Sequence, residues 1–223
     1  MSNPTNFVDD NQLGRLRDIY TATAALLTGT ILAAGTNNIG DVDIASIAAG
    51  ANRIGTVSGV LKTVSVTKAL AAAGDYAAGE VLSESAGAGT AWTFAAIARA
   101  NNASGYIVRA IALCQTTALT PRLTIFLFHT TPTCTLNDNA ANTAVLWADR
   151  ANFIGSIDFP AMEDLGTGVS QAIATPSTVG GLPLAFDTAA AADDLIGVVV
   201  TRDAITGESA GMNLLIALTV EQY

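Results

Sequence analysis

The sequence is poor in the side chains that most often carry enzymatic chemistry and metal binding. It holds one histidine, His129, and two cysteines, Cys114 and Cys134, among 223 residues. A Ser, Thr or Cys nucleophile needs a base within reach, and a lone histidine at the end of an apolar run is typical of a structural role. Structural zinc takes four nitrogen or sulfur ligands in paired spacings, which two distant cysteines cannot supply. We therefore expect no enzyme, no metal and no other cofactor.

Basic residues are also scarce, and this limits the partners of the chain. Ten Lys and Arg stand against nineteen Asp and Glu, so the formal net charge is −9 and the isoelectric point is near 4.3. The few basic residues are scattered, whereas phosphate neutralisation needs clustered cations. An acidic surface also disfavours anionic lipid headgroups. We expect no nucleic-acid or membrane partner, which leaves protein surfaces, glycans and small ligands.

Long apolar runs and a secretory signal are missing as well. The longest apolar stretch, residues 21–35, contains several Thr and two Gly and is shorter than the roughly 20 apolar residues of a spanning helix. The first eight residues contain no Lys or Arg. We expect neither a transmembrane segment nor export by the usual route. A disulfide between Cys114 and Cys134 stays open, and free, partly buried thiols are the expectation.

The composition that remains is that of a folded, strand-rich protein. Half of the residues are hydrophobic and 13% are charged, which is too apolar for a disordered chain. Ala, Val, Ile and Leu dominate, with Gly, Thr, Ser and Asn between them, as suits short strands joined by turns. The length favours one principal domain with an extension.

The N-terminal region predicts one amphipathic helix. After Asp9 and Asp10, which favour the positive end of a helix dipole, apolar residues recur at helical spacing. Its expected stop is Gly29 or Gly35. The apolar side chains that we expect to bind a partner are Leu13, Leu16, Ile19 and Tyr20.

An internal repeat follows this helix. Residues 33–42 return fifteen residues later as residues 48–57, in the shared frame AAGxNxIGxV. Each copy indicates a Gly and Asn turn that leads into a short strand, and two copies are too few for a solenoid. We interpret residues 1–59 as a helix and repeat-containing anchoring arm that binds a partner surface, with Ile39 and Ile54 as further apolar contacts.

From residue 60 onward the pattern is one of strands and turns. The stretch 136–152 reads as a long loop with a helical turn, and runs 106–114 and 123–128 are dense enough to be central strands that are covered on both faces or lie at an oligomer contact. The sequence therefore predicts that residues 60–223 form an all-β, jelly-roll-like sandwich. The expected strands are 64–70, 76–83, 92–98, 106–114, 123–128, 153–159, 171–174, 182–186, 195–201 and 212–220.

Acidic residues offer two further alternatives for chemistry. Asp158, Glu163 and Asp164 lie close together in sequence, as a carboxylate pair for glycoside cleavage would require, but they flank a Pro and precede a Gly-rich turn where solvated acids are routine. The same group, or Asp138 with its two Asn neighbours, could supply oxygen ligands to calcium, although no EF-hand spacing is present.

Glycine-rich and aromatic segments carry weaker alternatives. Residues 85–90 and 166–168 lack the GxxxxGK[ST] pattern of a phosphate loop and read as turns. The aromatic residues fall mostly inside expected strands, so core packing is the first interpretation, and a sugar-stacking platform would need two or three of them exposed together. These aromatic residues are Trp92, Phe94, Tyr106, Phe126, Phe128, Trp147, Phe153, Phe159 and Phe186.

Three segments carry a resemblance to a known class of proteins. They are the repeat AAGTNNIGDVDIAS with AAGANRIGTV, the run LTIFLFHTTPTCTLNDNAA followed by ADRANFIGSIDF, and the closing DLIGVVVTRDAITGESAGMNLLIAL. With these segments the chain resembles structural proteins encoded among the virion genes of tailed bacteriophages. The motifs are packing and turn motifs, so they indicate a lineage more than a task.

The resemblance implies a β-sandwich protein on the virion, which is assembled in the host cytoplasm. Such a protein decorates or cements the head, often as a trimer, by bridging the major capsid protein or other virion proteins. A head-fibre or tail-associated module that binds a receptor or glycan is the alternative. No catalytic residues carry over from the resemblance.

Overall fold

The computed structural model describes residues 10–27, 60–71, 74–116, 119–166, 168–176, 181–207 and 211–223. The chain divides into two compact units, Met1–Ile54 and Gly55–Tyr223. The repeat, with Ile39 and Ile54, lies outside the described residues, so the expectation for it stays a prediction.

The N-terminal unit contributes helix α1, Asp10–Leu27, as the apolar spacing predicted. Two threonine hydroxyls donate hydrogen bonds to backbone carbonyls one turn earlier in the same helix. Thr21 Oγ1 donates to the carbonyl of Arg17 at 2.8 Å, and Thr23 Oγ1 donates to that of Ile19 at 2.7 Å. The side chains that the structure describes along this helix are all exposed.

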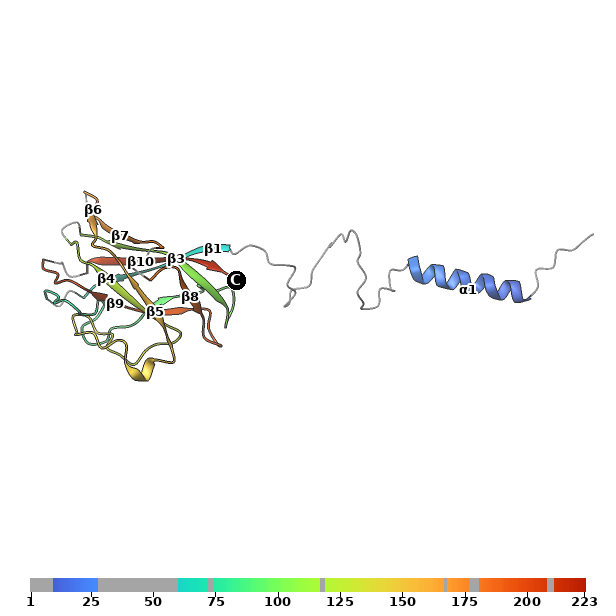
Figure 1. Cartoon of the computed structure of the whole chain (residues 1–223), viewed down its shortest axis with the longest axis horizontal. Coiled ribbons are helices and arrows are strands. Elements are labelled where there is room, and N and C mark those ends of the chain that lie inside the picture. Colours follow the sequence, from blue (N-terminus) through green and yellow to red (C-terminus); the bar gives the residue numbers. More distant parts are fainter. Residues whose placement is uncertain are drawn as a thin grey trace, which may run out of the picture. The chain divides into compact units, whose positions relative to one another are not determined.

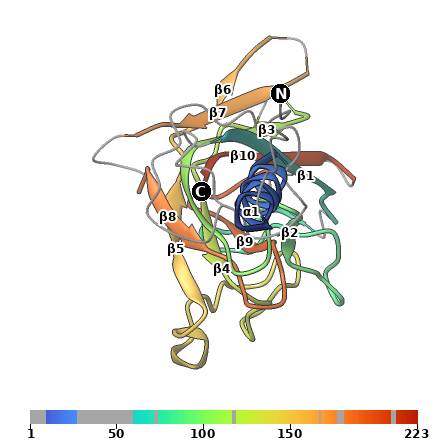
Figure 2. The ribbon, with the colours of Figure 1, turned by 90° about the vertical axis from the view of Figure 1, so that its right-hand side faces the viewer.

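The second unit is an all-β sandwich of two antiparallel sheets (Figures 1 and 2). In the first sheet the order is β1 (Val60–Ala69), β10 (Asn213–Gln222), β3 (Ser104–Cys114), β7 (Ser170–Ala174) and β6 (Glu163–Asp164), and β8 (Leu184–Asp187) also pairs with β3. In the second sheet the order is β2 (Trp92–Phe94), β9 (Leu195–Thr201), β4 (Leu123–Phe128) and β5 (Phe153–Asp158). The dense runs form the inner strands β3 and β4, as expected.

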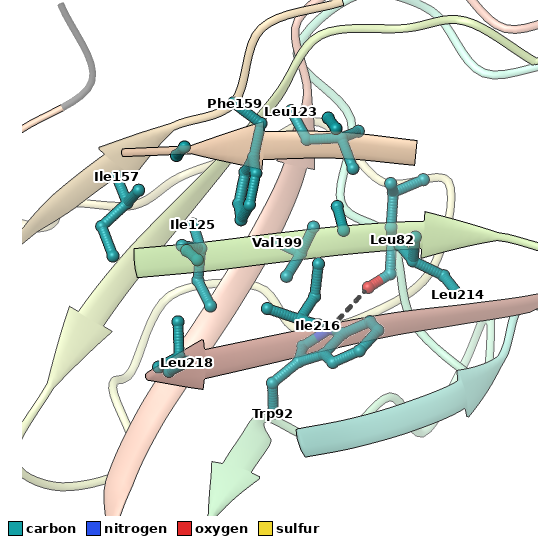
Figure 3. Packing of buried hydrophobic residues seen from close by; sticks show 14 of the residues in the cluster. Leu82, Trp92, Leu123, Ile125, Ile157, Phe159, Val199, Leu214, Ile216 and Leu218 are labelled. Carbon is teal, nitrogen blue, oxygen red and sulfur yellow. Dashed lines mark hydrogen bonds between the residues drawn. The ribbon is translucent and has the colours of Figure 1, made fainter. Parts of the chain in front are cut away.

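Alternation along the strands produces the core between the sheets. Alternate residues of β10, such as Ile216 and Leu218, are fully buried and face the second sheet, where they meet Ile125 and Val199 (Figure 3). The indole N–H of Trp92 donates to the carbonyl of Leu82 at 3.0 Å, so this large side chain is buried with its polar atom satisfied.

A second, smaller core covers the outer face of the second sheet. Outward side chains of β4 and β9 pack there against loop residues Val81 and Cys134. Every residue of β9 is consequently buried. The sequence left two explanations for the apolar run of β4, namely a strand covered on both faces or a strand at an oligomer contact. The first explanation holds, because other parts of the same chain cover both faces of β4.

Residues 76–83 depart from the expected strand and form a loop with isolated bridges. Tyr76 bridges to Ile205, and Val81 bridges to Val200. Gly79, at φ +87°, turns the backbone away from extended geometry. The expected strand 92–98 likewise ends at Phe94, and the two-residue strand β6 was not anticipated.

A partly buried ion pair between Lys68 and Glu84 lies beside Trp92. Lys68 Nζ lies 2.5 Å from Glu84 Oε2, also donates to Thr90, and sits 5.5 Å from the centre of the Trp92 ring. Burial lowers the pKa of Lys68, although the carboxylate opposes that effect. For Glu84 burial acts to raise the pKa, but hydrogen bonds from Lys68, Thr90 and Ser83 outweigh it and lower the pKa to about 2.

We expect this pair to make stability fall in acid. The folded-state pKa of Glu84 lies below its ordinary value of 4.5, so the stabilisation is fully present above pH 4.5 and is lost as the pH falls toward 2. Glu84→Gln should flatten this dependence and cost about 2 kcal/mol at neutral pH, because Lys68 loses its carboxylate. Urea unfolding across the acid range measures both effects, and an equally steep acid loss in both proteins would contradict the assignment.

Candidate binding surfaces

The residues suited to catalysis or metal binding are dispersed. Within the described ranges, no three or more His, Cys, Asp or Glu side chains are grouped so that they could hold a metal ion. His129 is mostly buried, and its Nε2 lies 3.7 Å from Asp187 Oδ1. We find no nucleophile and base arranged together in this part of the chain.

Both cysteines are free and buried, and they belong to different hydrophobic clusters. Burial raises the pKa of the Cys114 thiol, and burial together with the nearby Asp149 raises that of Cys134 to about 11. The nucleophilic thiolate is therefore scarce at neutral pH. These thiols act as small apolar side chains in the core.

The Asp138 carboxylate serves the fold. It is 2% exposed, accepts the Tyr76 hydroxyl at 2.9 Å to each oxygen, and accepts the backbone N–H of Ser83 at 2.7 Å. Its neighbour Asn137 accepts the N–H of Gly89 at 3.0 Å, which holds the Gly-rich turn. Structural hydrogen bonds thus use oxygens that the calcium alternative would need.

A hollow of about 360 Å³ opens between the ends of β4, β5 and β7. Its charged lining residues are Arg122, Asp158 and Arg202, above an apolar floor that includes Phe159. Arg122 is paired with Asp203 at 2.6 Å, and Asp158 accepts the Thr124 hydroxyl at 2.5 Å. Glu163 and Asp164 stand in β6 and do not line the hollow, so the three acids do not converge on one cleft.

Helix α1 places the four expected anchor residues at its surface. Leu13 is 49% exposed, Leu16 59%, Ile19 63% and Tyr20 77%. The described part of this helix therefore presents large apolar side chains that no described residue covers. Their binding role is untested and remains a prediction.

A second exposed apolar group lies on the sandwich, at the short 3-10 helix η1, Trp147–Asp149, drawn in yellow in Figure 1. Trp147 is 80% exposed, and Val145 and Leu146 before it are each 37% exposed. We call residues 145–147 the Trp147 tip. Core packing, the first interpretation for this tryptophan, was wrong. The sequence feature that could have indicated its exposure is its position in the stretch 136–152, which the sequence predicted to be a loop.

Hydrogen bonds and a cation–π contact support the backbone and the indole ring of the Trp147 tip. The buried carboxylate of Asp149 accepts both the backbone N–H and the hydroxyl of Thr133, at 3.0–3.1 Å. The Arg150 guanidinium donates to the Trp147 carbonyl at 2.8 Å and lies 4.6 Å from the centre of the indole ring. Side chains ordered before binding lose less entropy when they dock, so this tip suits a binding role.

The other exposed aromatic side chains of the sandwich form a separate pair. Tyr106 on β3 and Tyr223 at the C-terminus meet edge to face with ring centres 6.0 Å apart. The C-terminus and the yellow coil lie at different places in both views (Figures 1 and 2). The described aromatics therefore do not gather into one platform with Trp147.

No described helix is long and apolar enough to span a membrane. No family model matches the sequence, and no curated protein matches it.

We expect Trp147 and Asp149 to respond differently to mutation. Trp147→Ala should change the free energy of unfolding by less than about 0.5 kcal/mol, since the ring packs against little. Asp149→Ala should cost about 1–3 kcal/mol, because it leaves the Thr133 N–H without its acceptor. Thermal unfolding of both variants measures the contrast, and a large loss for Trp147→Ala would show that the ring serves stability.

Proposed function

We propose that the chain is a structural virion protein that decorates or cements a phage capsid by bridging neighbouring capsid subunits through non-covalent contacts. The observation that carries the proposal is helix α1, whose described side chains are exposed and include four large apolar residues. Exposed apolar groups of this size mark binding surfaces. The dispersed acids, buried thiols and paired histidine support a role other than catalysis.

The strand pairing supports the finer fold that we propose for the body, a jelly roll. The pairs are nested, because β1 pairs with β10, β2 with β9, β3 with β8 and β4 with β5. Nested pairing is what results when one long antiparallel ribbon folds over itself into two sheets. Jelly rolls built this way occur in viral capsid domains, which agrees with the proposed place on a virion.

Cementing follows from repetition of modest contacts. A specific interface buries about 1,200–2,000 Å² in total, and two contacts on one chain raise the effective concentration of the second once the first has formed. In the proposal Leu13, Leu16, Ile19 and Tyr20 anchor the chain to the major capsid protein or another virion protein. The Trp147 tip supplies a second contact from the sandwich, and pressure from packaged DNA must then break both.

The alternative is a head-fibre or tail-associated module that binds a receptor or glycan. An exposed tryptophan favours it, because sugar rings stack on indole faces. Its neighbours in the Trp147 tip are Val and Leu, which offer a sugar no hydrogen bonds, and the guanidinium of Arg150 already lies over the ring. A protein pocket fits this tip better. A specific glycan-array signal that Trp147→Ala abolishes would favour the alternative.

The anchoring role is tested on capsid shells that lack this protein. The full chain is mixed with shells and sedimented, beside the double variant Leu16→Glu with Ile19→Glu. We expect the affinity of the variant for the shells to be lower by about tenfold or more, because two anchors lose their apolar contact. Removal of residues 1–58 should have at least the same effect.

The matched control places the same two charges on polar positions of the opposite helix face, Asn11→Glu with Thr21→Glu. This control should bind as the natural chain does. Equal binding by the natural chain and the Leu16→Glu, Ile19→Glu variant would contradict the anchoring role. Absence of binding by the natural chain itself would contradict the cementing function.

A further inference from the structure

The Trp147 tip and the hollow at the ends of β4, β5 and β7 lie at opposite ends of one strand pair. In the antiparallel pair β4–β5, Thr124 is opposite Asp158 at the end that holds the hollow, and Phe128 is opposite Phe153 at the other end. The tip belongs to the connection that joins the strands at this second end. In both views the yellow coil with the tip and β7 lie on opposite sides of the sandwich (Figures 1 and 2). Six residues of strand span about 20 Å, so a tip cannot fill the hollow of its own copy.

The Trp147 tip presents an indole ring that its own copy leaves exposed. Trp147 is 80% exposed, and the apolar Val145 and Leu146 beside it are partly exposed. Tryptophan is enriched among the few residues that carry most of the energy of a protein interface, where it sits in a pocket of the partner. The tip therefore has the chemistry of an inserted group that needs a pocket.

The hollow has the room and the lining for such a group. A cavity of about 150 Å³ takes up benzene, so a hollow of about 360 Å³ has room for the two fused rings of an indole. Leu123, Phe159 and Pro160 supply apolar surface to its lining. An indole seated there would remove both its own carbon surface and this apolar lining from water.

The charges beside the tip and in the hollow are complementary. Arg150 brings a guanidinium to the tip, where it contacts the carbonyl and the ring of Trp147. Asp158 brings a carboxylate to the hollow, where it accepts the Thr124 hydroxyl. Among the described residues neither Arg150 nor Asp158 has an ion-pair partner. The two side chains can therefore pair with each other across a contact between copies.

The two arginines that line the hollow are compatible with this contact. Arg122 is already paired with Asp203 through two hydrogen bonds. The guanidinium of Arg202 makes one long hydrogen bond, of 3.4 Å, so little holds it in place. A guanidinium stacks on an indole face, and Arg150 occupies only one of the two faces of the Trp147 ring. Arg202 can take the second face.

We propose that the Trp147 tip of one copy inserts into the hollow of a neighbouring copy, with Arg150 paired to Asp158 across the contact. The tip and the hollow are different surfaces, so the contact runs head to tail, and its repetition can close a ring of copies. The inference rests on the proposed function and names the partner of the Trp147 tip. Neighbouring copies on the head are then linked to one another while helix α1 anchors each of them to the capsid.

The first test is sedimentation equilibrium of the full chain without capsid shells, up to about 1 mM because a single inserted side chain gives a modest affinity. The natural chain should exceed its monomer mass of 22.6 kDa. Trp147→Ala removes the inserted ring, and Asp158→Lys places a cation against Arg150. Each variant should raise the dissociation constant about tenfold or more.

Two matched controls separate the contact from general surface effects. Leu165→Ala removes another exposed apolar side chain, 56% exposed and outside the tip. Glu163→Lys makes the same change of charge as Asp158→Lys at an exposed position that does not line the hollow. Both controls should associate as the natural chain does.

The decisive test mixes the two variants. Trp147→Ala keeps its hollow and Asp158→Lys keeps its tip, so the mixture should form pairs of twice the monomer mass and nothing larger. Formation of these pairs also shows that both variants are folded. The chain has two tryptophans, and Trp92 is buried, so a blue shift of the emission on mixing would report the insertion of Trp147.

A monomeric natural chain would overturn the proposal, and so would a mixture of folded variants that stays monomeric while the natural chain associates. The outcome also separates this contact from the cementing function. A chain that binds capsid shells but never associates by itself would remove the tip-to-hollow contact and leave the cementing function standing. A chain that associates through the tip but does not bind shells would do the reverse.

Discussion

The register of β10 between β1 and β3 is the constraint on which the rest of the sandwich depends. It places Leu214, Ile216, Leu218 and Val220 in the core and sends the alternate residues outward. A slip of one residue would exchange these two sets and expose the core. Because β10 is the last strand, its pairing with β1 also joins the two ends of the sandwich domain.

Local patterns in the sequence account for most of the strands, but not for the segments whose backbone is shaped by contacts with distant residues. The apolar runs 123–128 and 195–201 gave strand bounds that match β4 and β9, because these two strands are buried on both faces. Residues 76–83 have similar apolar content, yet their backbone follows Asp138 and the turn at Gly79. The hydrogen bond between Tyr76 and Asp138 joins residues 62 positions apart, so no pattern within a short stretch of sequence predicts it.

Some of the candidate binding residues could likewise be predicted from a local pattern, and others could not. The helical spacing of Leu13, Leu16, Ile19 and Tyr20 predicted an exposed apolar stripe, because a single helix outside a core cannot cover its own face. Trp147 was missed, since an aromatic residue between apolar neighbours resembles a core position until the support of Asp149 beneath the loop is known.

These features support the proposal that the chain works by adhesion, with the sandwich and the amphipathic helix α1 as its contact elements. Electron cryomicroscopy of the phage particle tests that account most directly. We predict density for the two-sheet body on the outside of the head, with the helix of residues 10–27 against capsid subunits. Heads that lack this density, with the chain elsewhere or absent from the particle, would contradict it.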